Sequence, residues 1–473
     1  MAKRILILAA GVGSGHNSAA AAIEKAMVDI PDAGEVQRLD VLTTTNDGFN
    51  LLYDDTYFAL VAQVPWLVGW GYDNQDAPFQ RGPFQWWEQA NTTTTVRKIR
   101  EFNPDVVIAT HFLPARLVAL MIARGQLNAT LTLVDTDYDV QGMWLSAPLS
   151  TFFVAREETA AQLVGMGLPS DRVSVSGIPV QLGLDEPGDA AAIRERFGLD
   201  PAKPVVLISA GAAGGSYTVN IVRQVARCQA DFQAVVVCGR NEQLFAQVTE
   251  LASLSPGRFR VLGFTQEMPD LMRISSLFVG KPGGLSSAEC MAAGLPMVII
   301  NPIPGQEVRN ADYLLEEGAA VRCNYSTTVG YKIDALLANP ARLAELTANA
   351  RRVGRPNAAR TAAEVTLGLT APALWITRDA QRAMQKAFKD GVAVVDLPLE
   401  SQLRTLTDAE SGVSLAVFTA AQLEVVGAIP TSRTLSLSNK VMKTLDWKQE
   451  NLDLALAGRY VLGGEESKVF GLI

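Results

Sequence analysis

Histidine is almost absent from this 473-residue chain, which contains only His16 and His111. Two histidines are too few for a metal site built from several imidazoles, so that kind of site is excluded. Cysteine is also scarce, and no CxxC pair occurs. We therefore expect buried structural thiols in a reducing cytoplasm. The four cysteines are Cys228, Cys238, Cys290 and Cys323.

Long hydrophobic runs and clustered positive charge are missing as well. No stretch of about 18 uninterrupted apolar residues occurs, so no helix is expected to span a membrane. The apolar run at the N-terminus stops at Gly11 and leads into a glycine loop, unlike a signal peptide. The net charge of −8 and the lack of Lys/Arg runs argue against a nucleic-acid-binding protein that depends on phosphate contacts. We expect a soluble chain, or one that lies on a membrane surface.

Short β-branched or Leu-rich runs alternate with longer Ala-rich amphipathic stretches, which is typical of a parallel sheet covered by helices. Buried strands are expected at Arg4–Ala9, Val106–Thr110, Ala129–Val134, Phe152–Val154, Val205–Ser209, Gln233–Val237, Leu277–Val279 and Met297–Ile300. Helices are expected at Ser18–Met27, Pro114–Ala123, Glu157–Met166, Ala190–Phe197, Val219–Cys228, Ser286–Ala293 and Ala311–Glu316.

The length fits two domains and a small third, at roughly 100–200 residues each. Two similar halves each open with a strand, a glycine loop and a helix, which predicts two Rossmann-like domains facing a cleft. The expected boundaries are residues 1–180, 181–368 and 369–473. The last segment carries no motif, although strands at 392–396 and 414–418 and a helix at 378–389 are plausible. The sequence does not indicate its role.

The first glycine loop, Ala10–Ser18, follows a strand and opens a helix. It resembles the dinucleotide pattern GxGxxG, with Asp40 as the acid that would bind a ribose. The fit is imperfect because His16 stands where the third glycine belongs. A glycine-rich turn with a solvent-facing histidine is the simple alternative. The pattern favours a catalytic or ligand-contacting His16.

Three carboxylates follow the strand Ala129–Val134, at Asp135, Asp137 and Asp139. A D-x-D pair at the end of a strand can hold Mg²⁺ or Mn²⁺ against a diphosphate. Aspartates that cap backbone N–H groups are a common alternative. We favour a cleft-facing role without a metal for Asp137, such as orienting a base or an acceptor hydroxyl.

The segment Val279–Glu289 indicates a ligand-binding site more strongly than any other stretch of the sequence. A strand ends, two glycines allow close approach of the backbone, and Ser286 and Ser287 begin a helix. Free N–H groups and the positive end of a helix form an anion site suited to a diphosphate. Glu289, expected in the first turn, would accept hydrogen bonds from ribose hydroxyls. A helix cap without a ligand is the alternative.

A rigid loop follows the strand Met297–Ile300, because Pro302, Pro304 and Gly305 restrict it. It presents Gln306 and Glu307 at the carboxyl edge of the predicted sheet. An amide beside a carboxylate suits a polyhydroxylated sugar. A plain polar turn that caps the next helix is equally compatible with this stretch.

Residues 49–87 form the most aromatic region of the chain. Aromatic side chains in an irregular, Pro- and Gly-containing stretch can form a groove for a lipid acceptor or an interfacial anchor. Burial under a long loop is the alternative, and the acidity of the segment opposes a purely electrostatic attachment to membranes.

Together these segments resemble the monogalactosyldiacylglycerol synthase and processive diacylglycerol glucosyltransferase group within glycosyltransferase family 28. The likeness covers roughly residues 1–368 and stops before the C-terminal segment. The matching stretches are Ile7–Ala22, Phe102–His111, Leu133–Trp144, Phe153–Val180, Val237–Asn241, Val261–Met268, Gly280–Glu289 and Asn301–Val321.

The resemblance implies a GT-B fold, with the acceptor bound mainly by the first domain and the nucleotide sugar mainly by the second. It implies inverting transfer of a hexose from UDP-glucose or UDP-galactose to the hydroxyl of diacylglycerol, without a metal or other cofactor. The expected location is cytoplasmic, peripherally associated with the inner face of the cell membrane, with no nucleic-acid partner.

The resemblance also implies roles for single residues. His16 would remove the acceptor proton, with a pKa near neutrality, and Asp137 would orient or assist it. The helix beginning at Ser286 would stabilise the leaving diphosphate. The residues expected to bind the UDP-sugar are Gly15, Gly214, Gly239, Arg240, Asn241, Gly263, Phe264, Gly283, Gly284, Leu285, Ser286, Ser287, Glu289, Pro304, Gln306 and Glu307.

The chain departs from the family pattern in two places. The tail beyond about residue 370 is longer than the family core requires, and the acceptor side differs as well. Histidines are expected in this family near Gln141 and Ser146, and the chain has neither. Transfer to another lipid-linked acceptor, as in muropeptide-lipid N-acetylglucosaminyltransferases, is one alternative function. A UDP-sugar epimerase of GT-B shape and a non-catalytic nucleotide-binding module are two others.

Overall fold

The computed structural model describes residues 2–11, 15–45, 88, 91–146, 148–211, 215, 217–369, 385–386 and 389, and four short strands after residue 400. The aromatic segment 49–87, Gly214 and the predicted strand 392–396 lie outside the described residues. Of the predicted helix 378–389, only residues 385, 386 and 389 are described, and all three are helical.

A six-stranded parallel sheet forms the N-terminal half, in the order β2-β1-β3-β4-β5-β6. Its strands are β1 (Lys3–Ala9), β2 (Ala33–Asp40), β3 (Val106–Ala109), β4 (Thr130–Val134), β5 (Thr151–Val154) and β6 (Val173–Val175). The helices and 3-10 turns around it are α1 (Gly15–Met27), η1 (Val41–Thr44), α6 (Thr93–Phe102), α7 (Phe112–Ala123), η3 (Gly142–Trp144), α8 (Glu157–Gly165) and η4 (Ser170–Arg172). The central strands are buried on both faces, as their continuous apolar sequences predict.

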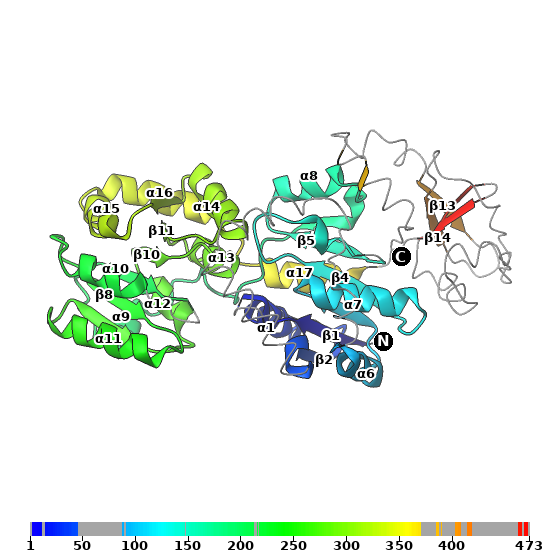
Figure 1. The fold of residues 1–473 in the computed structure, drawn as a ribbon, viewed down its shortest axis with the longest axis horizontal. Coiled ribbons are helices and arrows are strands. Elements are labelled where there is room, and N and C mark those ends of the chain that lie inside the picture. The colour runs from blue at the N-terminus through cyan, green and yellow to red at the C-terminus, as the bar shows by residue number, and fades with distance from the viewer. Residues whose placement is uncertain are drawn as a thin grey trace.

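A second six-stranded parallel sheet has the order β12-β11-β10-β7-β8-β9. Its strands are β7 (Val205–Ser209), β8 (Gln233–Val237), β9 (Phe259–Leu262), β10 (Leu277–Gly280), β11 (Met297–Ile300) and β12 (Ala320–Cys323). Its helices are α9 (Ala190–Arg196), α10 (Tyr217–Val225), α11 (Glu242–Ser253), α12 (Met268–Ile274), α13 (Gly284–Ala292), α14 (Gln306–Glu316), η5 (Ser326–Thr328), α15 (Val329–Leu337) and α16 (Pro340–Val353). Figure 1 shows the two halves side by side, with α13 at their boundary.

The helix α17 (Ala358–Gly368) returns from the second half to the first. Ala359, Ala362 and Ala363 are fully buried in the same core cluster as Ile5 and Ile23. The chain therefore crosses between the halves twice, before α9 and before α17 (Figure 1). The sequence-based boundary at residue 368 assigns this helix to the second half, whereas its side chains complete the core of the first.

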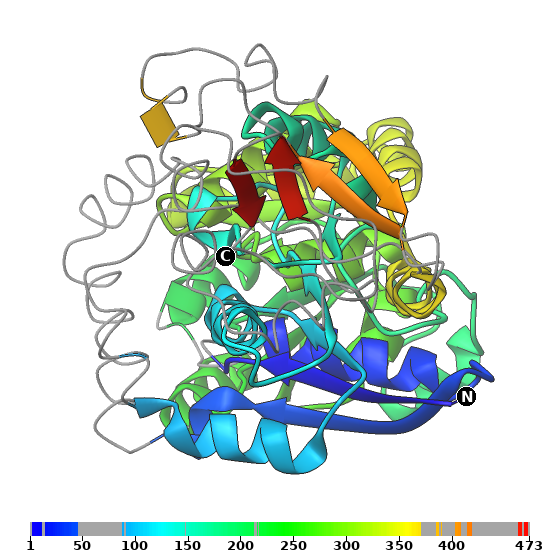
Figure 2. The same ribbon diagram turned by 90° about the vertical axis from the view of Figure 1, so that its right-hand side faces the viewer.

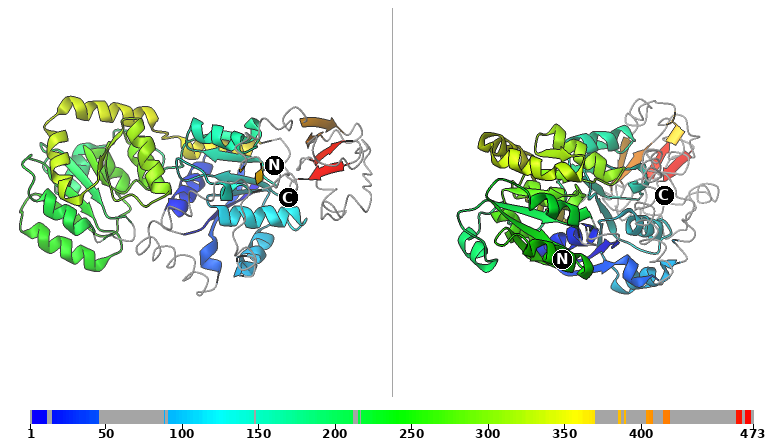
Figure 3. Two further views of the ribbon diagram at one scale, coloured as in Figure 1. Left: turned by 45° about the horizontal axis from the view of Figure 1, so that its top comes forward. Right: turned by 60° about the vertical axis from the view of Figure 1, so that its left-hand side comes forward.

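Four strands form two antiparallel pairs near the C-terminus: β13 (Leu403–Thr407) with β14 (Ser414–Phe418), and β15 (Leu462–Glu465) with β16 (Lys468–Gly471). The predicted strand 414–418 is confirmed. These strands lie beside the N-terminal half, on the side away from the second half (Figures 1 and 3), and Figure 2 views them face on. Across the described residues, no helix combines the length and hydrophobicity that a membrane span needs.

The topology defines where ligands can bind. β1 pairs with β2 on one side and β3 on the other, so the loops after β1 and β3 leave the sheet in opposite directions. β7 has the same place in the second sheet, between β8 and β10. Ligands of open α/β sheets bind at such switch points, at the carboxyl ends of the strands. His16 and His111 lie at the first, and the N-terminus of α13 follows the second.

Candidate active site

His16, the second residue of α1, is held in one tautomer by the backbone. Its Nδ1 atom lies 2.8 Å from the carbonyl oxygen of Thr110 and 3.0 Å from Oγ1 of Thr136. Because a carbonyl oxygen only accepts, Nδ1 carries the proton, and the lone pair of the neutral ring is on Nε2. The fixed tautomer therefore leaves Nε2 as a base.

Burial lowers the pKa of His16 to about 4, against the raising effects of the Thr110 carbonyl and of Asp40. The sequence-based expectation of a pKa near neutrality is wrong for this structure, because desolvation outweighs both favourable contacts. The imidazole is consequently neutral, and able to accept a proton, throughout the physiological pH range.

Aromatic rings surround this imidazole. The ring of His111 meets that of His16 edge to face, with 4.6 Å between centroids, and Trp144 lies 6.3 Å away. His111 caps α7, since its Nδ1 accepts the N–H of Leu113 at 3.1 Å. Phe112 stacks on His111 at 4.1 Å. These rings form an apolar wall beside the base.

Asp40 does not have the ribose-binding role that the dinucleotide pattern suggests. Its carboxylate accepts hydrogen bonds from the backbone N–H groups of Gly11 and Leu42 and from the side chain of Asn17. A Cβ atom at Gly11 would lie 2.5 Å from Asp40 Oδ2. Asp40 therefore holds the glycine loop in place.

Asp137 contacts the second half of the molecule. Its Oδ1 accepts a hydrogen bond of 2.8 Å from Asn310 Nδ2. Burial raises the pKa of Asp137 to about 6, although the hydrogen bond from Asn310 lowers it. The two atoms within hydrogen-bond distance of His16 Nδ1 belong to Thr110 and Thr136. These two residues, and not Asp137, therefore make the orienting contact with the imidazole.

The loop after β4 touches the N-terminus of α13 directly. A Cβ atom at Gly284 would stand 1.8 Å from the carbonyl oxygen of Thr136 and 2.8 Å from Asp137 Oδ1. Across the same boundary, a Cβ atom at Gly15 would lie 3.8 Å from Cβ of Leu285. The base of the first half and the helix end of the second half are therefore neighbours, and only glycine fits at position 284.

The N-terminus of α13 has no side-chain cap. The helix begins at Gly284, two residues before the predicted start, and its N-cap Gly283 has no side chain to occupy the first N–H groups. Ser287 is fully buried, and its Oγ has no hydrogen-bond partner. The donors of the first turn and the helix dipole favour a phosphate here, as the sequence predicts.

Glu289 lies in the second turn of α13, not in the first turn as predicted, because the helix starts earlier. Burial raises the pKa of its carboxyl to about 7. Among the described residues no hydrogen bond or ion pair of this side chain is found. A desolvated carboxyl without a partner is suited to hydroxyl groups of a ligand, so ribose binding by Glu289 stays a prediction with structural support.

The residues predicted to bind the UDP-sugar at positions 239–241 and 263–264 follow the ends of β8 and β9. A Cβ atom at Gly263 would lie 3.8 Å from the carbonyl oxygen of Gly239. The guanidinium of Arg240 stacks on Phe264 at 4.4 Å, and the Phe264 side chain is 53% exposed. The Oδ1 atom of Asn241 caps α11 by accepting the N–H of Leu244.

The predicted sugar-binding loop is shorter than expected, since α14 begins at Gln306. Gly305 precedes it with φ of +92°, a conformation that favours glycine. The buried Glu307 accepts the N–H of Ile303 at 2.7 Å, so part of its carboxylate caps this turn. Burial raises the pKa of Glu307, and the neighbouring Lys281 opposes that shift. Gln306 and Pro304 remain partly exposed at the sheet edge.

The three aspartates of the D-x-D loop point to different partners. Asp139 forms an ion pair with Arg309 at 2.6 Å, and Asp137 Oδ1 is bonded to Asn310. Burial raises the pKa of Asp135 well above its usual value. No cluster suited to a metal ion is found within the described residues.

Sequence reasoning missed Thr110, Thr136 and Asn310. Thr110 directly precedes His111, and Thr136 directly precedes Asp137. Asn310 stands three and four residues after Glu307 and Gln306, so it continues their face of α14. This spacing could have identified Asn310 from the sequence.

Comparisons with known proteins identify the family. The family model described as monogalactosyldiacylglycerol (MGDG) synthase matches residues 16–180, and that of the glycosyltransferase family 28 C-terminal domain matches residues 205–363. A processive diacylglycerol beta-glucosyltransferase of Bacillus licheniformis is 27% identical over 367 residues, 75% of this chain and 92% of the relative. The Bacillus cereus protein of the same name is 30% identical over 257 residues, 54% of this chain and 66% of the relative.

Solved structures share the architecture. MurG of Acinetobacter baumannii has a TM-score of 0.51 at 19% identity, covering 77% of this chain and 99% of its own. The UDP-GlcNAc 2-epimerase of Neisseria meningitidis has a TM-score of 0.51 at 16% identity, covering 77% and 99%. At these identities the likeness concerns the fold. With its two matching family models, this chain belongs to the monogalactosyldiacylglycerol synthase and processive diacylglycerol glucosyltransferase group of glycosyltransferase family 28 and has the GT-B fold.

Proposed function

We propose that this chain is an inverting glycosyltransferase that moves a hexose from a UDP-sugar to the hydroxyl of diacylglycerol, without a metal or other cofactor. A relative that matches 75% of the chain is named as a processive diacylglycerol beta-glucosyltransferase. The observation that carries the proposal is the position of a neutral His16, with Nε2 as its free base, beside the N-terminus of α13.

The donor half has the groups that a leaving UDP needs. The first turn of α13 offers uncapped N–H donors to the diphosphate, whose charge grows as the bond to the sugar breaks. Glu289 is available to the ribose, and Phe264 with Arg240 to the base and a phosphate. Gln306 and Glu307 lie at the sheet edge for the hexose hydroxyls.

The acceptor half supplies the base and an apolar wall. His16 takes the proton of the acceptor hydroxyl as its oxygen attacks the anomeric carbon, and the UDP oxygen leaves with the bonding electrons. The resulting imidazolium keeps its Nδ1 hydrogen bond to Thr110. Phe112 and Trp144 lie 5.9 Å apart next to His111, where they suit the apolar part of a lipid acceptor.

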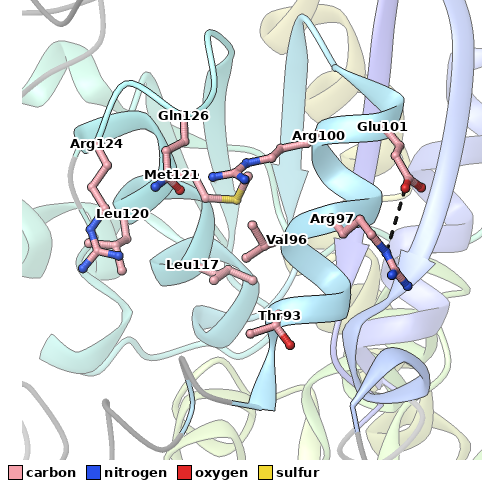
Figure 4. A pocket seen from close by; sticks show the side chains of 10 residues that line it. All are labelled: Thr93, Val96, Arg97, Arg100, Glu101, Leu117, Leu120, Met121, Arg124 and Gln126. Atoms are coloured by element: carbon pink, nitrogen blue, oxygen red, sulfur yellow. Dashed lines mark ion pairs between the residues drawn. The ribbon is translucent and has the colours of Figure 1, made fainter.

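Attachment to the inner face of the cell membrane is part of the proposal. A pocket of about 440 Å³ lies between α6 and α7, and Figure 4 shows Arg100 reaching over it towards Met121. Its floor is apolar, and within the described structure the guanidinium groups of Arg100 and Arg124 have no partner. Unpaired cations over an apolar floor suit an anionic lipid surface, even in a chain with net charge −8.

The transfer is tested with labelled UDP-glucose or UDP-galactose and vesicles that contain diacylglycerol, followed by lipid extraction. Labelled sugar in the organic phase, absent with His16→Ala, is the expected result. Epimerised nucleotide without a lipid product would replace the proposal with an epimerase. A product formed only with a lipid-linked muropeptide would overturn the diacylglycerol assignment.

Membrane attachment is tested by flotation with vesicles of phosphatidylglycerol or of phosphatidylcholine. We expect binding to the anionic vesicles that is lost in the double variant Arg100→Gln, Arg124→Gln. The matched control is Arg342→Gln, since Arg342 is paired with Glu345 at 2.7 Å in the second half. Equal flotation of the double variant and the control would remove the pocket from the membrane contact.

A further inference from the structure

Asn310 is the buried polar contact that joins the two halves at the site. Its side chain is fully buried in α14, and its carboxamide forms three hydrogen bonds. Nδ2 donates to Asp137 Oδ1 at 2.8 Å and to the carbonyl of Pro282 at 3.1 Å, and Oδ1 accepts the N–H of Tyr138 at 2.9 Å. One side chain therefore ties the loop after β4 to the segment that leads into α13.

The loop that Asn310 holds also carries a partner of the base. Thr136 precedes Asp137, and its Oγ1 accepts from Nδ1 of His16 at 3.0 Å. The carbonyl oxygen of Thr136 lies over the Cα atom of Gly284. A shift of this loop relative to α14 changes the position of the imidazole relative to the N-terminus of α13.

Other contacts hold the two halves together without Asn310. Arg309 pairs with Asp139 at 2.6 Å, and Tyr138 stacks on Tyr313 with 4.7 Å between centroids. The guanidinium of Arg156 lies 4.7 Å from the centroid of the Tyr313 ring. Loss of the Asn310 side chain should therefore loosen the loop while the halves stay associated.

We propose that Asn310 is a positioning residue for the transfer reaction: it fixes the Thr136–Tyr138 loop so that His16 faces the leaving group when the two halves are docked. This inference rests on the proposed function, because it takes His16 as the base and the end of α13 as the leaving-group site. It makes catalysis depend on a carboxamide that belongs to the donor half.

The kinetic test compares Asn310→Ala with Asn349→Ala, whose amide donates to the carbonyl of Gly318 within the second half. Misplacement of a reacting group by about 1 Å costs roughly 100-fold in rate, so we expect kcat of Asn310→Ala to fall by about that factor. The affinity for UDP, measured by calorimetry, should stay within about threefold, because the uncapped donors of α13 remain. The control variant should keep its kcat. Equal kcat in the two variants overturns the proposal.

A spectroscopic test needs neither substrate. The chain has two histidines, so labelling of the histidine ring carbons gives two signals in nuclear magnetic resonance spectra. In Asn310→Ala the signal of His16 should shift or broaden. The signal of His111 should shift less, because its Nδ1 stays bonded to the N–H of Leu113 although its ring lies 4.6 Å from that of His16. An unchanged His16 signal in the folded variant overturns the proposal, whereas a merely structural interface would leave that signal in place.

A second variant covers the case in which Asn310→Ala does not fold. Thr136→Val keeps the shape of the side chain but removes the oxygen that faces His16, and Thr136→Ser restores it. We expect the His16 signal to shift in the valine variant and to return in the serine variant; a valine variant without effect overturns the proposal. If no glycolipid product forms with the native chain, the proposed function fails, and the His16 signal still decides separately whether Asn310 positions the imidazole.

Discussion

The carbonyl oxygen of Thr136 lies over the Cα atom of Gly284, so closely that a methyl group at Gly284 would stand 1.8 Å from it. This contact brings the loop of one sheet against the first residue of a helix from the other. The two residues limit how closely the loop after β4 can approach the N-terminus of α13.

The first prediction follows from this contact. Gly284→Ala should lower the rate of sugar transfer by at least roughly 100-fold, because the loop must move by more than 1 Å to admit the methyl group. The matched control is Gly165→Ala in α8, where a Cβ atom meets nothing within 4 Å. There we expect an unchanged rate and a small gain in thermal stability, since alanine is favoured over glycine in a helix. Equal rates for the two variants would contradict the close approach.

The second prediction concerns the base. His16→Ala should lower the transfer rate by about 10²–10⁴-fold or more, the usual contribution of general base catalysis. UDP binding should stay nearly intact, because the donors on α13 are unchanged. Calorimetric titration with UDP beside the transfer assay measures both. Equal loss of binding and transfer would refute the assignment.

The third prediction is a pH dependence of stability. Folded His16 has a pKa of about 4, whereas an unfolded histidine takes up a proton near 6.5. The unfolded state therefore binds more protons between these values, and the free energy of unfolding should fall as the pH falls through this window. Denaturant titrations of the native chain and His16→Gln compare the two proteins, and the difference includes the loss of the effect of His16 on the pKa of the neighbouring His111.

The expected size follows from the width of the pH interval. Between pH 7 and pH 5 the native chain should lose about 2 kcal/mol relative to the variant. If the difference in the free energy of unfolding between the native chain and His16→Gln does not change with pH, then His16 titrates normally in the folded state.

The fourth prediction concerns Glu289, whose pKa is about 7 in the absence of ligand. An ionised carboxylate accepts hydrogen bonds from both ribose hydroxyls, so UDP should bind more tightly at pH 8 than at pH 6, by up to about tenfold. In Glu289→Gln the affinity should be weaker and should keep only the pH dependence of UDP itself. Identical pH profiles of the dissociation constant would remove Glu289 from the ribose site.

The sequence predicts most of the buried framework. The central strands have continuous apolar runs, and β7, β8 and β11 were predicted with their observed bounds. The short edge strands β6 and β9 were missed because each is partly exposed and has no long apolar run. Gly167, Gly294 and Gly318 have positive φ at helix ends, where glycine is favoured.

The candidate site was predicted in part. His16 and the helix after Gly283 are visible because a glycine loop and a helix start have local sequence patterns. The nearer partner of His16 Nδ1 is a backbone carbonyl, which any residue at position 110 supplies, so no sequence pattern marks it. Asn310 acts through contacts more than 170 positions away in the chain, and those depend on how the two halves dock.

The return of α17 to the first half has a consequence for movement between the halves. Two separate crossings of the backbone allow the halves to rotate about one axis. They also resist twisting of one half against the other and separation of the two halves. A protease that cuts one crossing would leave the halves joined by the other, so such a nicked chain should still migrate as one particle under native conditions.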